Sequence, residues 1–238
     1  IRGFGNALVL VDGVPGSFDN IDASEIESIT VLKDASANIY GFSAANGAVL
    51  VTTKKGVAGR TAINYNGYYG LQSNTTYPTM LNAGQYTELY DEAVLNDQFV
   101  NNRLFAPTFG ADIVKKWKEQ NSPEYTSTNW QDLAIRKTAP MTQHNVNVNG
   151  GAEKVKYFLS GSYLDQNSIW QSDATTFKRY NFRSNIIADI TDRLTAEVNV
   201  GGIVTDLHSP VSATSNLIIN GIRRSLPTSK AYANNNPN

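Results

Sequence analysis

Histidine and cysteine carry much of the catalysis and metal binding in proteins, and this sequence has few of them. Of its 238 residues, two are histidines, His144 and His208, and none is a cysteine. The histidines do not form a metal-ligand spacing, and His144 lies in a predicted strand with no pair of carboxylates nearby. The lack of cysteine excludes a disulfide framework and thiolate metal sites. We therefore expect a structural role for His144, and predict no metal ion and no cofactor.

Two pairs of carboxylates, Glu25 with Glu27 and Asp91 with Glu92, lie on predicted helices. On a helix surface such pairs are more often solvated than used in general acid–base catalysis. Gly3 and Gly5 precede a predicted strand rather than follow one, so they do not form a dinucleotide-binding turn. The sequence has no nucleophile elbow and no Gly-Lys-Ser/Thr phosphate loop. It predicts no catalytic residue, and the protein is not expected to be an enzyme.

The composition excludes several classes of protein. With a formal net charge of -1 and 17% charged residues, the chain is neither a polybasic nucleic-acid binder nor an acidic tail protein. No apolar run approaches the roughly 18 residues of a membrane helix. Ile1 opens inside a folded pattern, so no signal peptide is expected. A membrane β-barrel is compatible with all of this, because alternating strands escape hydropathy scans.

The first part of the chain reads as a small α+β unit. Residues 7–11 are an apolar run that predicts a strand, and the Asp-Gly and Pro-Gly pairs in residues 12–16 predict a tight turn. Residues 24–27 have the spacing of a capping box, which predicts the start of a short helix. Residues 29–32 predict a second strand. On pattern alone, this unit is also compatible with an ordinary soluble α+β domain.

The stretch 34–56 combines a capped turn, a glycine turn and a strand. Asp34 and Ser36 are expected to accept hydrogen bonds from backbone N–H groups of the following turn. Tyr40-Gly41 and Asn46-Gly47 supply two places where a positive φ costs little. Residues 48–53 are rich in β-branched side chains and predict a covered strand.

This stretch closely resembles the end of the plug domain in SusC-type (SusC/RagA) TonB-dependent outer-membrane transporters. Residues 2–3, 8–15 and 26–37 follow the order and spacing of that plug. Ser43 stands where the family pattern usually has an arginine. The resemblance implies a plug domain over residues 1–56 and the start of the barrel over residues 57–238, with Lys54 and Lys55 at the periplasmic edge.

Residues beyond 60 alternate between apolar and polar side chains. The segments near 63–72, 143–149, 155–164, 180–190 and 194–205 each have one apolar and one polar face if they are strands. A soluble sandwich alternates in the same way, so alternation alone does not identify a membrane protein. Asn-rich polar faces favour a wet lumen, and six aromatic residues suit interfacial girdles: Tyr65, Tyr69, Tyr157, Tyr163, Tyr180 and Phe182. With the resemblance, the predicted fold is a partial transmembrane β-barrel, about five of roughly 22 antiparallel strands, with an α+β plug.

The lengths of the connections set the expected orientation. The turns at 149–154 and 191–193 are short, as periplasmic turns are, and the long excursion at 74–140 then lies outside the cell. The excursion carries three predicted helices, at 86–94 after the cap Asn82, at 111–120 and at 130–137, which are expected to pack on the barrel rim. From Ser209 onward the composition predicts an outer loop, cut off in mid-course.

The resemblance implies active import across the bacterial outer membrane, driven by TonB through a segment missing here. It also implies a SusD-like surface lipoprotein as a lid, outer-membrane lipid around the strands, and an oligosaccharide or peptide as ligand; no nucleic acid is expected. The residues that bind substrate are not identifiable. A soluble carbohydrate-binding β-sandwich, a glycan hydrolase with carboxylates elsewhere, and a passenger of another envelope machine stay open.

The residues expected to matter are contacts between plug and barrel rather than catalysts. A polar interface can hold a plug and still let it move, because its hydrogen bonds can be exchanged with water. The expected structural and gating residues are Asp12, Gly13, Lys33, Asp34, Tyr40, Gly41, Asn46, Gly47 and Lys54.

Overall fold

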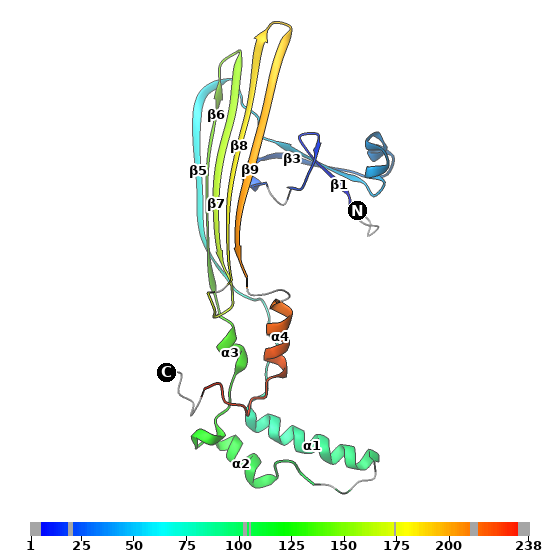
Figure 1. The fold of residues 1–238 in the computed structure, drawn as a ribbon, viewed down its shortest axis with the longest axis vertical. Coiled ribbons are helices and arrows are strands. Elements are labelled where there is room, and N and C mark those ends of the chain that lie inside the picture. Colours follow the sequence, from blue (N-terminus) through cyan, green and yellow to red (C-terminus); the bar gives the residue numbers. More distant parts are fainter. Residues whose placement is uncertain are drawn as a thin grey trace. The chain divides into compact units, whose positions relative to one another are not determined.

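The computed structural model describes residues 6–18, 21–101, 104, 106–173, 175–209 and 214–232. The chain forms two compact units (Figure 1). The first unit comprises residues 1–71, 140–167 and 176–207, and the second comprises residues 72–139, 168–175 and 208–238. The glycine pair at 3 and 5 and the last residues, 233–238, lie outside the described residues.

The first unit begins with a small mixed sheet. Its strands are β1 (Leu8–Val11), β2 (Val14–Pro15), β3 (Ile26–Leu32) and β4 (Ala48–Thr53), in the order β2-β1-β4-β3. β1 runs parallel to β4, while β3 runs antiparallel to it. The strands predicted near 7–11, 29–32 and 48–53 are therefore confirmed, and β3 begins three residues earlier than expected.

The turn between β1 and β2 follows from its two central residues. Asp12 and Gly13 both have positive φ angles, of 49° and 86°, and Val11 pairs with Val14 across them. Two positive φ angles are typical of a type I′ hairpin turn, which favours Asp-Gly because its twist matches that of the strands.

The capping box expected at Ser24 is wrong. The short 3-10 helix η2 (Ala23–Glu25) is capped by Asp22, whose Oδ1 accepts from the Ser24 backbone N–H at 2.9 Å. Ile26 is already extended, with a ψ of 130°, so Glu27 lies in β3 and cannot complete a helix.

The 3-10 segment η3 (Asp34–Ala44) leads into β4, with Gly41 and Gly47 at positive φ as predicted. The Ser36 hydroxyl, expected to accept from the following turn, donates to the Lys33 carbonyl at 2.7 Å. The Asp34 side chain lies outside the described part of the structure. Small residues let η3 pack closely on the sheet, and the buried cluster consists of Ala37, Ala44 and Ala48, with Leu8 and Leu32 against it.

The second sheet of this unit is a meander of five long strands. These are β5 (Gly59–Gln72), β6 (Ala139–Gly151), β7 (Val155–Asn167), β8 (Thr176–Thr191) and β9 (Leu194–His208), each next to its neighbour in sequence. The registers of the central pairs are antiparallel, with Asn145 opposite Ser162 and Ser162 opposite Asn181. All five predicted strands are thus present.

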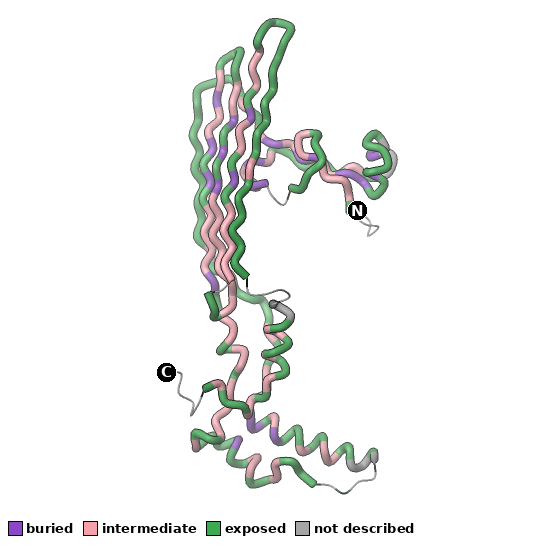
Figure 2. Tube along the Cα trace, viewed as in Figure 1, coloured by how far each residue is buried: buried purple, intermediate pink, exposed green. Residues whose placement is uncertain are grey.

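The burial of this sheet is the reverse of that in a water-soluble domain. The buried positions that dot β6, β7 and β8 in Figure 2 are mainly polar, and they include Asn145, Asn147, Ser160, Ser162, Asn181 and Asn185. The apolar residues between them are exposed, Val146 by 43% and Leu159 by 40%. A sheet with a covered polar face and a bare apolar face suits lipid on one side and a polar interior on the other.

A row of rings crosses the apolar face. Tyr65, His144, Tyr163 and Tyr180 lie on four successive strands, with His144 opposite Tyr163 and Tyr163 opposite Tyr180. The ring centroids of Tyr65 and His144 are 6.1 Å apart, and those of Tyr163 and Tyr180 are 4.9 Å apart. Tyr163 lies eight residues after Val155, which corresponds to about 20 Å of membrane depth for a strand tilted by about 40°. A row of rings across neighbouring strands is typical of the interfacial girdle of a membrane barrel, and His144 is one of the rings in this row.

The second unit is mainly helical. It holds α1 (Ala83–Asn101), α2 (Ala111–Glu119), the 3-10 turn η4 (Pro123–Tyr125), α3 (Trp130–Ala134) and α4 (Thr214–Arg224). Asn82 caps α1 as predicted, with its Oδ1 accepting from the Gln85 backbone N–H at 2.9 Å. Within the described residues, none of the helices has both the length and the hydrophobicity needed to span a membrane.

Two predictions for the helical unit need correction. α3 ends at Ala134 rather than Lys137, because Ile135 turns to an extended conformation and forms a β-bridge with Trp170. The region after Ser209 contains α4, where a loop was predicted. The Ser, Thr and Asn residues of this segment favour a loop prediction, although its isoleucines have the spacing of an amphipathic helix.

Candidate functional site

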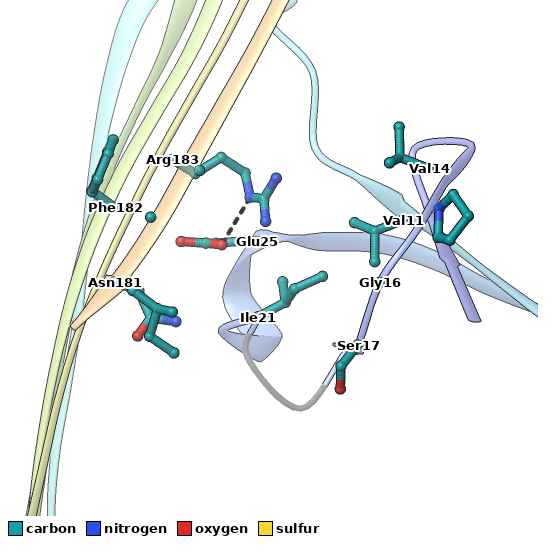
Figure 3. A pocket seen from close by; sticks show the side chains of 13 residues that line it. Val11, Val14, Gly16, Ser17, Ile21, Glu25, Asn181, Phe182 and Arg183 are labelled. Carbon is teal, nitrogen blue, oxygen red and sulfur yellow. Dashed lines mark hydrogen bonds and ion pairs between the residues drawn. The ribbon is translucent and has the colours of Figure 1, made fainter. Parts of the chain in front are cut away.

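Arg183 is the centre of the contact between the small sheet and the long strands. It projects from the polar face of β8, and its Nε donates to Glu25 Oε2 at 3.0 Å (Figure 3). Its Nη1 lies 3.9 Å from Asp12 Oδ2. The side chains of Arg183 and Asp12 are 12% exposed and that of Glu25 is 2% exposed. One cation therefore serves two carboxylates in a largely buried position.

Glu25 is held on both carboxylate oxygens. Ser160 on β7 donates from Oγ to Oε1 at 2.6 Å, while Arg183 occupies Oε2. The Glu25 carbonyl also accepts from the Lys54 backbone N–H at 2.8 Å. A buried carboxylate needs such partners, because an unpaired buried charge is strongly destabilising. The expectation that Glu25 lies on a solvated face is therefore wrong.

Asp12 ties the ends of two strands together. Its Oδ1 accepts from the Thr53 backbone N–H at 2.8 Å, and its Oδ2 accepts from the Thr53 hydroxyl at 2.6 Å. Thr53 is completely buried and is the last residue of β4. The turn that places Asp12 is thus also a fixed point for the end of β4.

Asn185 on β8 holds the end of β4 from the other side. Its Nδ2 donates to Thr53 Oγ1 at 2.9 Å and to the Lys54 carbonyl at 2.7 Å. Thr53 therefore accepts from the long sheet and donates to Asp12 through one hydroxyl. Asp12, Thr53 and Asn185 form a continuous hydrogen-bonded chain, next to the Arg183 ion pair.

Further polar contacts follow the chain out of the small sheet. Gln143 on β6 donates to Asp22 Oδ2 at 2.7 Å, and Lys55 pairs with Glu197 on β9 at 2.6 Å. Gly56 passes so close to β7 that an added Cβ would lie 2.1 Å from the Tyr157 backbone nitrogen. Only glycine fits at this point without moving a strand.

The interface leaves room beside its charges. A cavity of about 320 Å³ lies next to the ion pair, lined by Glu25 and Arg183 together with Val11, Ile21 and Asn181 (Figure 3). Asn145 Nδ2 and Asn185 Oδ1 are buried without a hydrogen-bond partner among the described residues. Polar atoms in such positions are usually satisfied by water. The arrangement is a polar contact between two surfaces, and within the described residues there is no group of side chains that could hold a metal ion.

Of the predicted site residues, some lie at the contact with the long sheet and others do not. Asp12 and Lys54 lie at the contact with the long sheet, the latter through its backbone. Gly13, Gly41 and Gly47 supply positive φ angles. Tyr40 lines a second cavity that also includes Asp12 and Lys55. Lys33 and Asn46 are exposed.

Sequence reasoning did not identify most of the residues that make the contact, among them Asp22, Glu25, Thr53, Ser160, Arg183 and Asn185. Arg183 and Asn185 were on the predicted polar face of their strand, and a charge on that face was the available signal. Asp22 and Glu25 gave no such signal, because they lie within what resembles an ordinary helix start.

Residues 1–48 match the family model described as "TonB-dependent Receptor Plug Domain". The chain is 30% identical to TonB-dependent receptor P3 of Formosa agariphila over 85% of its own length and 18% of that protein. It is also 30% identical to TonB-dependent receptor SusC of Bacteroides thetaiotaomicron over 74% of its length and 15% of that protein. The chain thus spans less than a fifth of these two relatives.

Two solved structures of a transporter are similar to this chain in fold. The structure of the RagAB peptide transporter matches with a TM-score of 0.66 and 28% identity, over 85% of this chain and 24% of that one. The RagAB peptide importer in its closed-closed state matches with the same TM-score and 27% identity, over 87% of this chain and 25% of that one.

Proposed function

We propose that this chain, which carries the plug-to-barrel part of a SusC-like TonB-dependent transporter of the bacterial outer membrane, belongs to a protein that imports a nutrient. In this proposal residues 1–56 are the later part of the plug and residues 57–238 begin the barrel. The protein works as a transporter rather than an enzyme.

One observation carries the proposal: the buried ion pair between Arg183 and Glu25 lies on the polar face of a sheet whose other face is apolar. A water-soluble sandwich would bury the apolar face instead. The small sheet therefore acts as a stopper against the wet side of a lipid-embedded wall, and this favours the transporter over a carbohydrate-binding sandwich.

The chemistry of the contact suits a stopper that has to move. A typical hydrogen bond contributes about 0.5–1.5 kcal/mol net, because water replaces it when it breaks. The contacts at Asp12, Asp22, Glu25 and Thr53 are polar in the same way, and those to the three carboxylates contribute about 1.5–3 kcal/mol each because they involve charged groups. Together these contacts stabilise the docked plug by several kcal/mol. When the plug moves away from the long sheet, the surfaces that become exposed are polar rather than apolar. A pull by TonB on a segment outside this chain would break these contacts in turn.

The proposed ligand is an oligosaccharide or a peptide, and the proposed partners are TonB and a SusD-like lipoprotein that covers the outer opening. Similarity to SusC and to a protein described as a peptide transporter supports these assignments. The row of rings that includes Tyr163 and Tyr180, together with the exposed apolar residues of the same face, supplies the surface for outer-membrane lipid.

The test is uptake by cells that carry the complete transporter. Labelled oligosaccharide and peptide mixtures are offered to cells with TonB, to cells without TonB, and to cells without the transporter. We expect one mixture to enter only when both proteins are present. Uptake that persists without TonB would show that import is not driven by TonB. Recovery of the protein from the soluble fraction would contradict its assignment as an outer-membrane transporter.

A further inference from the structure

The helical unit contains a cavity of its own, of about 400 Å³. Four segments far apart in sequence build it: residues 74–80 after β5, α3, residues 169–170, and α4. This volume lies in the range of small-ligand pockets, which are lined mainly by apolar side chains with a few polar groups for orientation.

Most residues of the cavity wall are apolar, and Asn74, Thr76, Tyr77, Gln131 and Arg223 add polar groups to it. Ile135, Ile169, Ile219 and Ile222 line it together with Trp170. A sugar is covered with hydroxyl groups, and hydroxyls buried against isoleucine would lose their hydrogen bonds with water. An apolar amino-acid side chain has no such cost and gains from burial at about 25 cal/mol per Å². The wall therefore favours an apolar side chain over a sugar ring.

The rim of the cavity carries a positive charge. Arg223, in the last turn of α4, lines the cavity and is exposed, and no acidic side chain is among the residues that line it. A guanidinium group presents paired N–H donors that match a carboxylate. A ligand that matches both features carries an apolar side chain and, a few ångströms away, a carboxylate. The C-terminal residue of a peptide has both groups.

Two further groups could recognise the peptide backbone. The hydroxyl of Tyr77 is buried and has no hydrogen-bond partner among the described residues, while burial raises the pKa of this group. It therefore stays protonated at physiological pH, and can donate to a carbonyl or accept from an amide. Gln131 on α3 also lines the cavity, and its side-chain amide both donates and accepts.

We propose that this cavity binds the C-terminal residue of a short peptide, with its apolar side chain among the four isoleucines and its carboxylate at Arg223. The proposal rests on the proposed function and narrows its ligand from oligosaccharide or peptide to peptide.

The experiment uses the complete transporter in detergent and three probes: dansyl-Gly-Gly-Leu, the same peptide with a C-terminal amide, and maltohexaose. Binding of the peptides is followed by fluorescence anisotropy, and binding of the sugar by calorimetry. We expect the free-acid peptide to bind about tenfold more tightly than the amide, and maltohexaose not to bind. Arg223→Ala should remove the tenfold preference, whereas Arg224→Ala, which changes the adjacent arginine outside the cavity lining, should keep it.

The aliphatic wall is tested in the same way. Ile219→Asn should weaken both peptides about tenfold, while Leu217→Asn, at a position that is 65% exposed on the same helix, should not. Equal effects of Arg223→Ala and Arg224→Ala, absence of peptide binding, or binding of maltohexaose in place of the peptides would overturn the peptide site. TonB-dependent uptake by cells is measured separately, so a failure of the peptide site would leave the proposed import function untouched.

Discussion

Arg183 on β8 donates to Glu25 at the end of η2, although the two residues are 158 positions apart in the sequence. The bond joins the polar face of the long sheet to the small sheet that lies against it. Because both side chains are largely buried, loss of one partner leaves the other as an uncompensated charge.

Replacement of Arg183 is therefore expected to loosen the plug while the barrel still assembles. Breaking a buried ion pair costs about 3–5 kcal/mol, and Arg183→Ala leaves both Glu25 and Asp12 without their cation. Cells carrying Arg183→Ala in the complete transporter should become sensitive to a large antibiotic that the outer membrane normally excludes. The matched control is Arg193→Ala, in the exposed turn between β8 and β9. Equal sensitivity of the two variants would count against the ion pair as a restraint.

The coupling of the pair can be measured directly with a double-mutant cycle. Glu25→Gln removes the charge and keeps the hydrogen bond from Ser160 possible. If the two residues act as a pair, Arg183→Ala should have a smaller effect in the Glu25→Gln background than alone, since coupled contacts are not additive. Planar-bilayer conductance of the four proteins gives the comparison, and additive effects would show that the residues act independently.

Asn185 is expected to protect the segment after β4, which contains Lys54 and Lys55, from proteolysis. Its amide donates both to Thr53 and to the Lys54 carbonyl, so Asn185→Ala removes two bonds, each of about 1 kcal/mol. Limited trypsin digestion should then cut after Lys54 or Lys55 several-fold faster. Asn147→Ala is the control, because among the described residues the Asn147 side chain bonds within the long sheet, to Asn64 and Asn145. An unchanged cleavage rate in Asn185→Ala would contradict the assigned role.

Local backbone chemistry explains which parts of this fold were predictable. The hairpin at Asp12-Gly13 and the glycine at position 41 follow from φ angles that few other residues adopt. The five long strands follow from a side-chain period of two. In both cases the signal lies within a few residues, and tertiary contacts did not override it.

The contact residues needed information that no local window contains. Glu25 was expected on a solvated helix face, since nothing near it in sequence shows that Arg183 and Ser160 reach it. Asp22, not Ser24, caps η2 because the helix begins at Ala23, one residue before Ser24. α4 was read as a loop, because its apolar residues stand among polar ones that favour turns and caps.

Gly56 is expected to tolerate no side chain. An added Cβ would lie 2.1 Å from the backbone nitrogen of Tyr157, and a backbone atom in a strand cannot move aside cheaply. Gly56→Ala should destabilise the folded barrel by about 1–3 kcal/mol, as other overpacked substitutions do. The measurement is the temperature at which the complete transporter loses its compact mobility in detergent gels. Gly161→Ala is the control, since its nearest neighbouring atom lies at 4.0 Å, and equal behaviour of the two would contradict the close passage.

Leu159 tests whether the bare apolar face meets lipid. It lies midway along β7 between Val155 at the short turn and Tyr163 in the ring row, and it is 40% exposed. An arginine at the midplane of a membrane barrel costs about 2–4 kcal/mol, and one near the interface costs about 0–1 kcal/mol. Leu159→Arg in the complete transporter should therefore be far more destabilising than Val155→Arg, as measured by denaturant unfolding from liposomes. If the face met water instead, an exposed arginine would be tolerated at both positions and the two variants would unfold alike.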